Sequence, residues 1–285
     1  MPEPPPAEDV GRAVRAALEE DRALDDVTTL ATVPGTLRGR AVLVAREPGV
    51  AAGLAVAAAV FAYVDASVSW EPRVADGGAF AGGDVLAAVT GPARALLQAE
   101  RVALNFLQRL CGTATRTRAL VDAVAGTRAV ILDTRKTTPG LRDLEKYAVR
   151  CGGGSNHRRD LAVMAMIKDN HREALARQGL SLAEGVAAIR RRSPGVPVEV
   201  EVDGLDELDA ALAAAPEWVL LDNMSVADMA KAVQRTVGRA KLEASGGVTL
   251  ETVRAIAETG VDAISVGGLT HSARALDISL DLTFE

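Results

Sequence analysis

The sequence predicts a mixed α/β protein, with an α+β layer in the first hundred residues and an incomplete βα barrel after it. From Arg128 onward, short apolar segments alternate with helical patterns, which is typical of successive βα units and a parallel sheet. Six such strands are visible, fewer than the eight of a complete barrel. An open, doubly wound sheet is the alternative for this half of the chain.

The first half of the chain contains mixed patterns. Apolar residues at Val10, Val14 and Leu18 have helical spacing, which predicts a helix over 7–20. We expect residues 2–6 to be a disordered N-terminal segment and residues 25–29 to form a polar turn. Further patterns predict a strand over 37–45, a helix over 54–63, short strands between 68 and 89, and a long helix from Pro92 to about Leu110.

The second half is predicted to contain strands separated by helices. Strands are expected at 129–132, 163–167, 197–202, 218–221, 240–244 and 262–266, and helices at about 142–151, 181–192, 205–215, 226–237 and 249–259. Because the carboxyl ends of barrel strands meet at one mouth, charged residues there should face a common pocket. These residues are Asp133, Lys168, Glu201, Asp222 and Glu243.

Composition excludes several classes of protein. The formal charge of −6 argues against a nucleic-acid or anionic-membrane partner for the surface as a whole. The N-terminus lacks a signal-peptide pattern, and the most apolar stretch, 50–64, is too short to span a membrane. The two cysteines, Cys111 and Cys151, suggest neither a disulfide framework nor a metal site. We therefore expect a cytoplasmic protein whose cysteines are packed residues.

The segment 133–171 reverses the charge balance of the chain. It has eight Lys or Arg, five Asp or Glu, and two of the three histidines. Arg135 and Lys136 follow one predicted strand, and Lys168 follows the next. Between them, glycines begin the loop 152–158, where backbone can approach a ligand closely. Cations gathered at strand ends predict an anionic substrate.

Two glycine pairs also follow predicted strands. Ser245-Gly246-Gly247 precedes a helix expected to begin near Thr249, and Gly267-Gly268 repeats the arrangement one unit later. Exposed backbone N–H groups at a helix start are suited to a phosphate. Either pair alone also fits a plain turn, but two in succession favour a phosphate cradle.

The residues alone leave several roles open. Glu201 and Asp222 could hold a divalent metal, stabilise a positive carbon, or merely balance nearby cations. Lys168 could form a Schiff base. His157 fits a general acid or base, or a hydrogen-bonded loop residue, and Arg101 fits a solvated position on its helix.

Ordered sequence blocks run through nearly the whole chain. They include D-V-T-T at 26–29, A-R-E-P-G-V-A-A-G-L at 45–54, E-R-V-A-L-N-F-L-Q-R-L-C-G-T-A-T at 100–115, D-T-R-K-T-T-P-G-L-R at 133–142, G-G-G-S-N-H-R at 152–158, I-K-D-N-H at 167–171, E-V-E-V-D at 199–203, L-D-N-M-S at 221–225, S-G-G-V at 245–248 and V-G-G-L-T-H-S at 266–272. Taken together, these blocks resemble the quinolinate phosphoribosyltransferase family.

The resemblance implies a fold and a reaction. The fold is an N-terminal α/β sandwich domain at 1–113, joined by the tail 272–285, and a barrel of six to seven strands at 114–271. In the reaction, quinolinate and phosphoribosyl pyrophosphate give nicotinate mononucleotide, pyrophosphate and carbon dioxide, with Mg²⁺. The resemblance also implies a homodimer.

The resemblance assigns roles by position. It implies that Arg135, His157, Arg158 and Lys168 bind the quinolinate carboxylates, with Thr134 and Lys136 in the same loop, and that Arg101 reaches the neighbouring subunit's site. It further implies catalytic roles for Lys136, Glu201 and Asp222, metal binding by Glu201 and Asp222, and a 5′-phosphate cradle made of Ser245, Gly246, Gly247, Gly267 and Gly268.

The sequence also departs from the family pattern. Asp160 and Val163 stand where the family tends to have Gly and Asp, and Gly268 stands where Ala is common. Because Asp160 and Val163 lie close to Arg158 and Lys168, substrate orientation is the property that these two differences would affect. A related phosphoribosyltransferase acting on another aromatic acid, a Schiff-base lyase and a non-catalytic phosphate-ligand sensor remain the alternatives.

Overall fold

The computed structural model describes residues 2–285, and the chain divides into two compact units. Unit 1 combines Met1–Arg118, Lys136–Gly154 and Gly268–Glu285, and unit 2 combines Ala119–Arg135 and Ser155–Gly267. Each unit is therefore built from segments that are distant in the sequence. The boundary expected between residues 113 and 114 stays a prediction.

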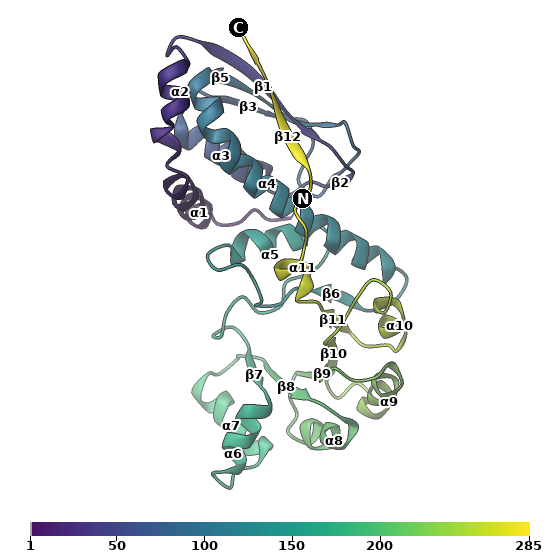
Figure 1. Ribbon diagram of the computed structural model, residues 1–285. Helices are drawn as coiled ribbons and strands as arrows, with labels where there is room; N and C mark the ends of the chain where they lie inside the picture. Colours follow the sequence, from purple (N-terminus) through teal and green to yellow (C-terminus); the bar gives the residue numbers. More distant parts are fainter. Residues whose placement is uncertain (1) are drawn as a thin grey trace. The chain divides into compact units, whose positions relative to one another are not determined.

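Unit 1 contains a four-stranded antiparallel sheet in the order β12-β1-β5-β3. The C-terminal strand lies next to the first strand of the chain, as Figure 1 shows in yellow beside β1. Residues of β1 alternate between exposed and buried at its start, so one face of the sheet turns toward the core. The strands are β1 (Arg38–Ala45), β3 (Ser69–Pro72), β5 (Val85–Pro92) and β12 (Ile278–Phe284), with a separate pair formed by β2 (Gly49–Val50) and β4 (Ala79–Phe80).

Helices supply the rest of the unit 1 core. Phe61 of α3 and Leu96, Leu107 and Leu110 of α4 are fully or almost fully buried, so these two helices carry much of the apolar packing. The helices of the unit are α1 (Ala7–Glu20), the short 3-10 turn η1 (Ala23–Asp25), α2 (Val27–Thr32), α3 (Leu54–Val64), α5 (Arg142–Cys151) and α11 (Gly268–His271), together with most of α4 (Ala93–Ala123).

Three local predictions for unit 1 were wrong. The expected polar turn at 25–29 is partly helical, because Asp26 accepts hydrogen bonds from the N–H groups of Thr28 and Thr29 and caps α2. The long helix continues past Leu110 to Ala123. The lead at 2–6 has a buried Pro5, and Arg150 donates to the carbonyl of Glu3.

Substitution by alanine at two helical glycines of unit 1 should change the stability of the protein in opposite directions. A Cβ on Gly112 of α4 would lie 1.9 Å from the carbonyl oxygen of Arg274, whereas a Cβ on Gly11 of α1 would meet nothing within 4 Å. We expect Gly112→Ala to destabilise the protein by about 1–3 kcal/mol, since backbone must shift. Gly11→Ala should stabilise it by about 0.4–1 kcal/mol. Urea unfolding measures both, and equal effects would contradict the packing at Gly112.

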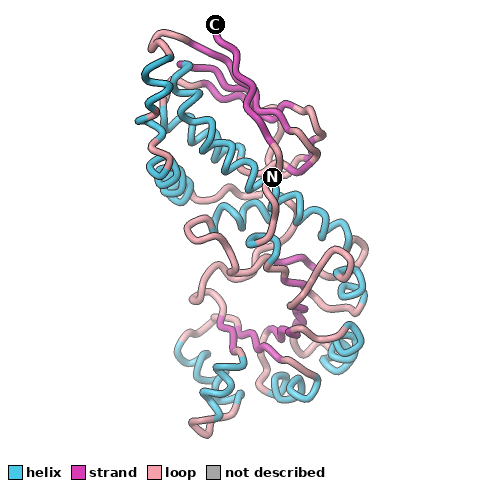
Figure 2. Tube along the Cα trace, viewed as in Figure 1, coloured by secondary structure: helices cyan, strands magenta, loops and turns pink. Residues whose placement is uncertain are grey.

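Unit 2 contains a six-stranded parallel sheet in the order β6-β11-β10-β9-β8-β7. In Figure 2 these strands follow an arc, with helices of the same unit along its outer side. The strands are β6 (Val130–Leu132), β7 (Ala165–Ile167), β8 (Val198–Val202), β9 (Trp218–Asp222), β10 (Lys241–Ser245) and β11 (Ala263–Ser265), and the helices are α6 (Asp169–Ala176), α7 (Leu182–Arg192), α8 (Leu205–Ala213), α9 (Val226–Thr236) and α10 (Val253–Glu258).

The strand order confirms the incomplete barrel. Consecutive strands are neighbours from β7 to β11, and β11 pairs with β6, so the order is that of a ring. Within residues 2–285, only a pairing between β6 and β7 is missing from this ring. A doubly wound sheet would instead reverse its order at a switch point.

Two helices of unit 2 differ from the predictions. The short helix α6 after Lys168 was not predicted, and α10 begins at Val253 instead of near Thr249. A turn occupies the residues in between, where the Thr249 N–H donates to the Thr252 hydroxyl at 3.0 Å. In the part of the chain that the structure describes, no helix has both the length and the apolar character needed to cross a membrane.

Candidate functional site

The sheet of unit 2 has one polar face and one apolar face. Paired residues of parallel strands share a face, and side chains alternate along each strand. Glu199 pairs with Trp218, while Glu201 and Glu243 both pair with Leu220, so the acidic side chains of β8 and β10 share one face with Asp222. The opposite face is apolar and buried, and it includes Val198, Val200, Val202, Val219, Leu221 and Leu242. The fold therefore places carboxylates on the inner side of the arc.

Lys168 and Glu201 form an ion pair at this inner face. Lys168 directly follows β7 and precedes α6, and its Nζ contacts Oε2 of Glu201 on the neighbouring strand. The Glu201 side chain is 11% exposed and that of Lys168 43%. Two residues predicted for the site from separate blocks are thus brought into direct contact.

A buried aspartate fixes the loop that carries His157. Asp133, at the end of β6, is fully buried and accepts the backbone N–H of His157 at 2.8 Å and the side-chain amide of Asn156 at 2.6 Å. Ser155 holds the same loop to β6, since its N–H donates to the Ile131 carbonyl at 2.8 Å. The loop therefore has a defined position beside the sheet.

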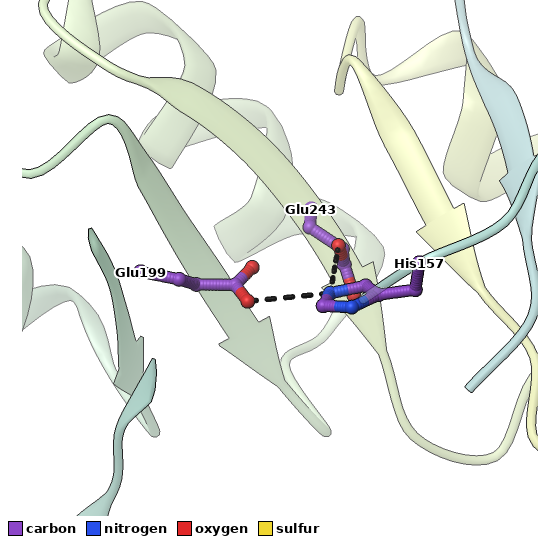
Figure 3. A group of neighbouring side chains, drawn as sticks. All are labelled: His157, Glu199 and Glu243. Atoms are coloured by element: carbon purple, nitrogen blue, oxygen red, sulfur yellow. Dashed lines mark ion pairs between the residues drawn. The ribbon is translucent and has the colours of Figure 1, made fainter. Parts of the chain in front are cut away.

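His157 lies between two buried glutamates (Figure 3). Its Nε2 is 3.3 Å from Oε2 of Glu199 and 3.2 Å from Oε2 of Glu243, and its side chain is 8% exposed. Burial lowers the pKa of His157, but the two carboxylates outweigh this and raise the pKa to about 9. Burial also raises the pKa of Glu199. Nδ1 accepts the backbone N–H of Arg158 at 2.7 Å, which uses its lone pair and opposes protonation there.

Arg158 adds a second cation to the same loop. Its guanidinium donates to the Met164 carbonyl at 2.9 Å and contacts the Met166 sulfur at 3.4 Å. Burial lowers the pKa of Arg158 and the charge of Arg135 lowers it further, while the carboxylates of Glu199 and Glu243 partly oppose this. Two guanidinium groups that repel each other in this way are stabilised when an anion lies between them.

The predicted phosphate residues of unit 2 lie at the ends of β10 and β11. Gly246 has a φ of 95°, and a Cβ there would lie 2.1 Å from Oδ1 of Asn223. The Asn223 N–H donates to the Ser245 carbonyl at 2.9 Å, so the turns after β9 and β10 are in contact. Gly247 continues the turn, and Gly267 follows β11. The helix start expected beside Ser245 is not there, because α10 begins later.

Three predicted residues belong to unit 1. Arg101 is exposed on α4. The Lys136 carbonyl accepts the Thr270 hydroxyl at 2.7 Å, and Gly268 is the first residue of α11. Thr134 is partly buried in the segment that precedes them and belongs to unit 2.

Sequence reasoning missed Glu199 as a site residue and assigned no role to Glu243. A signal for Glu199 was present, because the run V-E-V-E-V at 198–202 places two carboxylates on one face of a strand that is otherwise valine. The convergence of β8 and β10 on His157 was not visible, since it depends on the curvature of the sheet.

Comparison with known proteins identifies related sequences over most of the chain. A family described as quinolinate phosphoribosyl transferase, C-terminal domain, matches residues 113–281. Its N-terminal domain counterpart matches residues 26–111. Both matches follow the order expected for one protein of this kind.

Individual relatives agree with the family matches. Nicotinate-nucleotide pyrophosphorylase (carboxylating) of Mycobacterium leprae is 50% identical over 94% of this chain and 95% of its own. Quinolinate phosphoribosyltransferase (decarboxylating) 1b of Nicotiana tabacum is 41% identical over 98% and 84%. The crystal structure of NadC from Streptococcus pyogenes superposes with a TM-score of 0.93, at 40% identity over 100% of both chains.

Proposed function

The chain belongs to the quinolinate phosphoribosyltransferase family, and from this premise we propose how its residues perform the family's reaction. The enzyme transfers a phosphoribosyl group from phosphoribosyl pyrophosphate to quinolinate and releases carbon dioxide. The products are nicotinate mononucleotide and pyrophosphate, and the reaction belongs to NAD biosynthesis.

The observation that carries this function is the match to the family over both domains and to a relative that is 50% identical over 94% of the chain, and the influence of Arg135 on the pKa of Arg158 places a second cation near it. Quinolinate has two carboxylates on adjacent ring carbons, and two neighbouring guanidinium groups complement such a dianion. His157 belongs to the same loop as Arg158, and Lys168 follows the next strand. These four residues are our proposed quinolinate-binding set, with Thr134 beside Arg135.

We assign the pyrophosphoryl sugar to the strand ends of β8 to β11. The turns at Ser245, Gly246 and Gly247 bring backbone close to a ligand without side-chain bulk, which suits the 5′-phosphate. Gly267 and Gly268 are the second part of this cradle. Glu201 and Asp222 are the acids proposed to contact the ribose.

Glu201 and Asp222 also fit Mg²⁺ by the chemistry of their donors. Magnesium prefers oxygen ligands and commonly binds through one or two carboxylates together with substrate phosphates. Lys168 already neutralises Glu201 in part, so Asp222 carries more of the available negative charge. When bound, the ion would neutralise charge on the departing pyrophosphate.

Positioning and charge complementarity would drive catalysis, without an enzyme nucleophile. The bond from C1 of the ribose to pyrophosphate breaks, and the pyridine nitrogen attacks the positive carbon that Glu201 and Asp222 stabilise. The ring then carries a positive charge and accepts the electron pair of the bond to the 2-carboxylate. Carbon dioxide leaves, and the ring carbon takes a proton. We propose that Lys136 stabilises the negative charge that develops during the transfer.

We further propose a homodimer in the cytoplasm. Arg101 is an exposed cation on α4, and the family resemblance supports its use in the site of a second subunit. Both cysteines are free and buried, and burial raises the pKa of each to about 12, which fits packed thiols in a reducing compartment.

Turnover with two substrates tests the function. Purified protein with phosphoribosyl pyrophosphate and Mg²⁺ should convert quinolinate to nicotinate mononucleotide, with one carbon dioxide released for each pyrophosphate. Nicotinate, which lacks the 2-carboxylate, should be a much poorer substrate because it leaves one of the paired guanidinium groups without a partner. Turnover of nicotinate alone would instead favour a phosphoribosyltransferase acting on another aromatic acid.

A further inference from the structure

We propose that Glu199 and Glu243 are positioning residues, which hold the imidazole of His157 by a two-carboxylate clamp on Nε2 inside the quinolinate-binding set. The inference rests on the proposed function, since it assigns the clamp to quinolinate binding. Neither glutamate has a role in the mechanism above. Both are buried, at 0% and 1% exposure. Burying a carboxylate without a compensating group costs free energy of folding.

The clamp follows from the strand register. Glu199 lies on β8 and Glu243 on β10, with β9 between them, and the curvature of the sheet turns both side chains toward the same ring nitrogen (Figure 3). Both Glu199 oxygens and Oε1 of Glu243 have no hydrogen-bond partner within residues 2–285. His157 forms ion pairs with both of these carboxylates, at 3.3 and 3.2 Å.

The hydrogen bond at Nδ1 of His157 determines which ring nitrogen carries the proton and therefore which nitrogen faces the two carboxylates. Nδ1 accepts the Arg158 N–H, so the proton of the neutral ring is on Nε2, and Nε2 also carries a proton when the ring is charged. In either form, Nε2–H faces Glu199 and Glu243. Asp133 holds the backbone of the same residue from β6, and the clamp fixes the side chain. Plane and tautomer are then set before a substrate arrives, which lowers the cost of binding it.

A divalent cation is the competing occupant of this cluster. Donor atoms of His157, Glu199 and Glu243 all lie within 4.8 Å of one another, as a metal site requires. Metal binding through Nε2 would move the imidazole proton to Nδ1, where it would oppose the Arg158 N–H at 2.7 Å. The hydrogen bond therefore favours the clamp over a metal.

The test combines substrate kinetics with the spectrum of the ring. Leucine at both glutamate positions, as Glu199→Leu with Glu243→Leu, removes the acceptors and keeps most of the volume. We expect the KM for quinolinate to rise about tenfold or more, with the KM for phosphoribosyl pyrophosphate within about twofold. On a His157→Ala background the same pair should change the quinolinate KM no further. Glu258→Gln, at an exposed pair on α10, is the matched control.

Nitrogen NMR reads the clamp without any substrate. The chain has three histidines, and the spectrum of His157→Asn identifies the signals of His157. At a pH above the His157 pKa of about 9, where the ring is neutral, we expect the proton on Nε2 in the wild type and loss of this single tautomer in the leucine variants. If the leucine variants fail to fold, the isosteric variants Glu199→Gln and Glu243→Gln replace them. Each should shift the Nε2 signal, and each should raise the quinolinate KM by less than the tenfold expected for the leucine pair.

Three results would overturn the proposal. The first is an effect of the glutamate substitutions that persists in full on the His157→Ala background, and the second is an unchanged His157 spectrum in the variants. The third is one equivalent of a divalent metal in the purified wild type that the glutamine variants lack. Failure of the wild type to turn over quinolinate would count against the proposed function, and the NMR result would still decide the clamp.

Discussion

Arg158→Ala should lower kcat/KM for quinolinate by about 30- to 5,000-fold, equivalent to roughly 2–5 kcal/mol. The reason is that Arg158 is partly buried, and we propose that its guanidinium and that of Arg135 both bind the substrate dianion. The loss should appear mainly in the KM for quinolinate, because the guanidinium contacts carboxylates in the ground state as well as in the transition state. Initial-rate kinetics with each substrate varied in turn measure this.

The neighbouring arginine provides the matched control. Arg159 is exposed and pairs with Asp160 at 3.5 Å, so Arg159→Ala should leave kcat/KM within about twofold. Arg158→Lys keeps the charge but loses the planar fork, and it should recover only part of the activity. Equal, small effects at 158 and 159 would remove Arg158 from the proposed site.

Much of the fold of unit 2 could be predicted from the sequence because its signals are local. Each strand is a short apolar run, and each is followed by a helical pattern, so six strands were predicted close to their observed bounds. The short helix α6 was missed because it contains no buried residue and therefore has no apolar periodicity. The start of α10 was placed too early because the residues after Gly247 resemble a helix start but form a turn.

The segments that make up unit 1 were harder to predict. The strand β12 lies at the end of the chain and pairs with β1, more than two hundred residues earlier. The family resemblance placed the tail 272–285 with the N-terminal domain, but the pairing itself is set by the whole core and not by the local pattern. Likewise, the capping role of Asp26 depends on the direction of the chain after it, and a polar segment alone does not reveal that direction.

The candidate site likewise has residues that could be predicted from the sequence and contacts that could not. The family resemblance supplied the residues that we propose to contact substrate, and the fold brings two of them, Lys168 and Glu201, into contact with each other. Asp133 and Glu199 support the site without being proposed to contact substrate. Asp133 was predicted at a strand end and the run V-E-V-E-V includes Glu199, but their burial and their partners on other segments are seen only in the folded structure.

A similar supporting group lies in unit 1, where we expect the second large effect. Glu145 of α5 is fully buried, and Arg109 of α4 donates to its Oε1 at 2.9 Å. The Thr138 N–H donates to Oε2 of the same carboxylate at 2.9 Å, and its hydroxyl donates to Oε1 at 2.7 Å. Arg109 also donates to the carbonyls of Thr270 and Ala273. One buried ion pair therefore joins α4 and α5 to the loop that begins at Lys136.

Arg109→Ala should destabilise the protein by about 3–5 kcal/mol, because it leaves the Glu145 charge buried without its cation. Urea unfolding at neutral pH measures the loss, and Arg254→Ala, at an exposed helix pair with Glu258, should cost less than about 1 kcal/mol. The double variant Arg109→Met with Glu145→Gln should recover part of the stability that Arg109→Ala loses, since no unpaired charge then remains. A cost for Arg109→Ala no larger than that for Arg254→Ala would mean that water or another cation compensates Glu145. In that case the ion pair would not be what holds the Lys136 loop in unit 1.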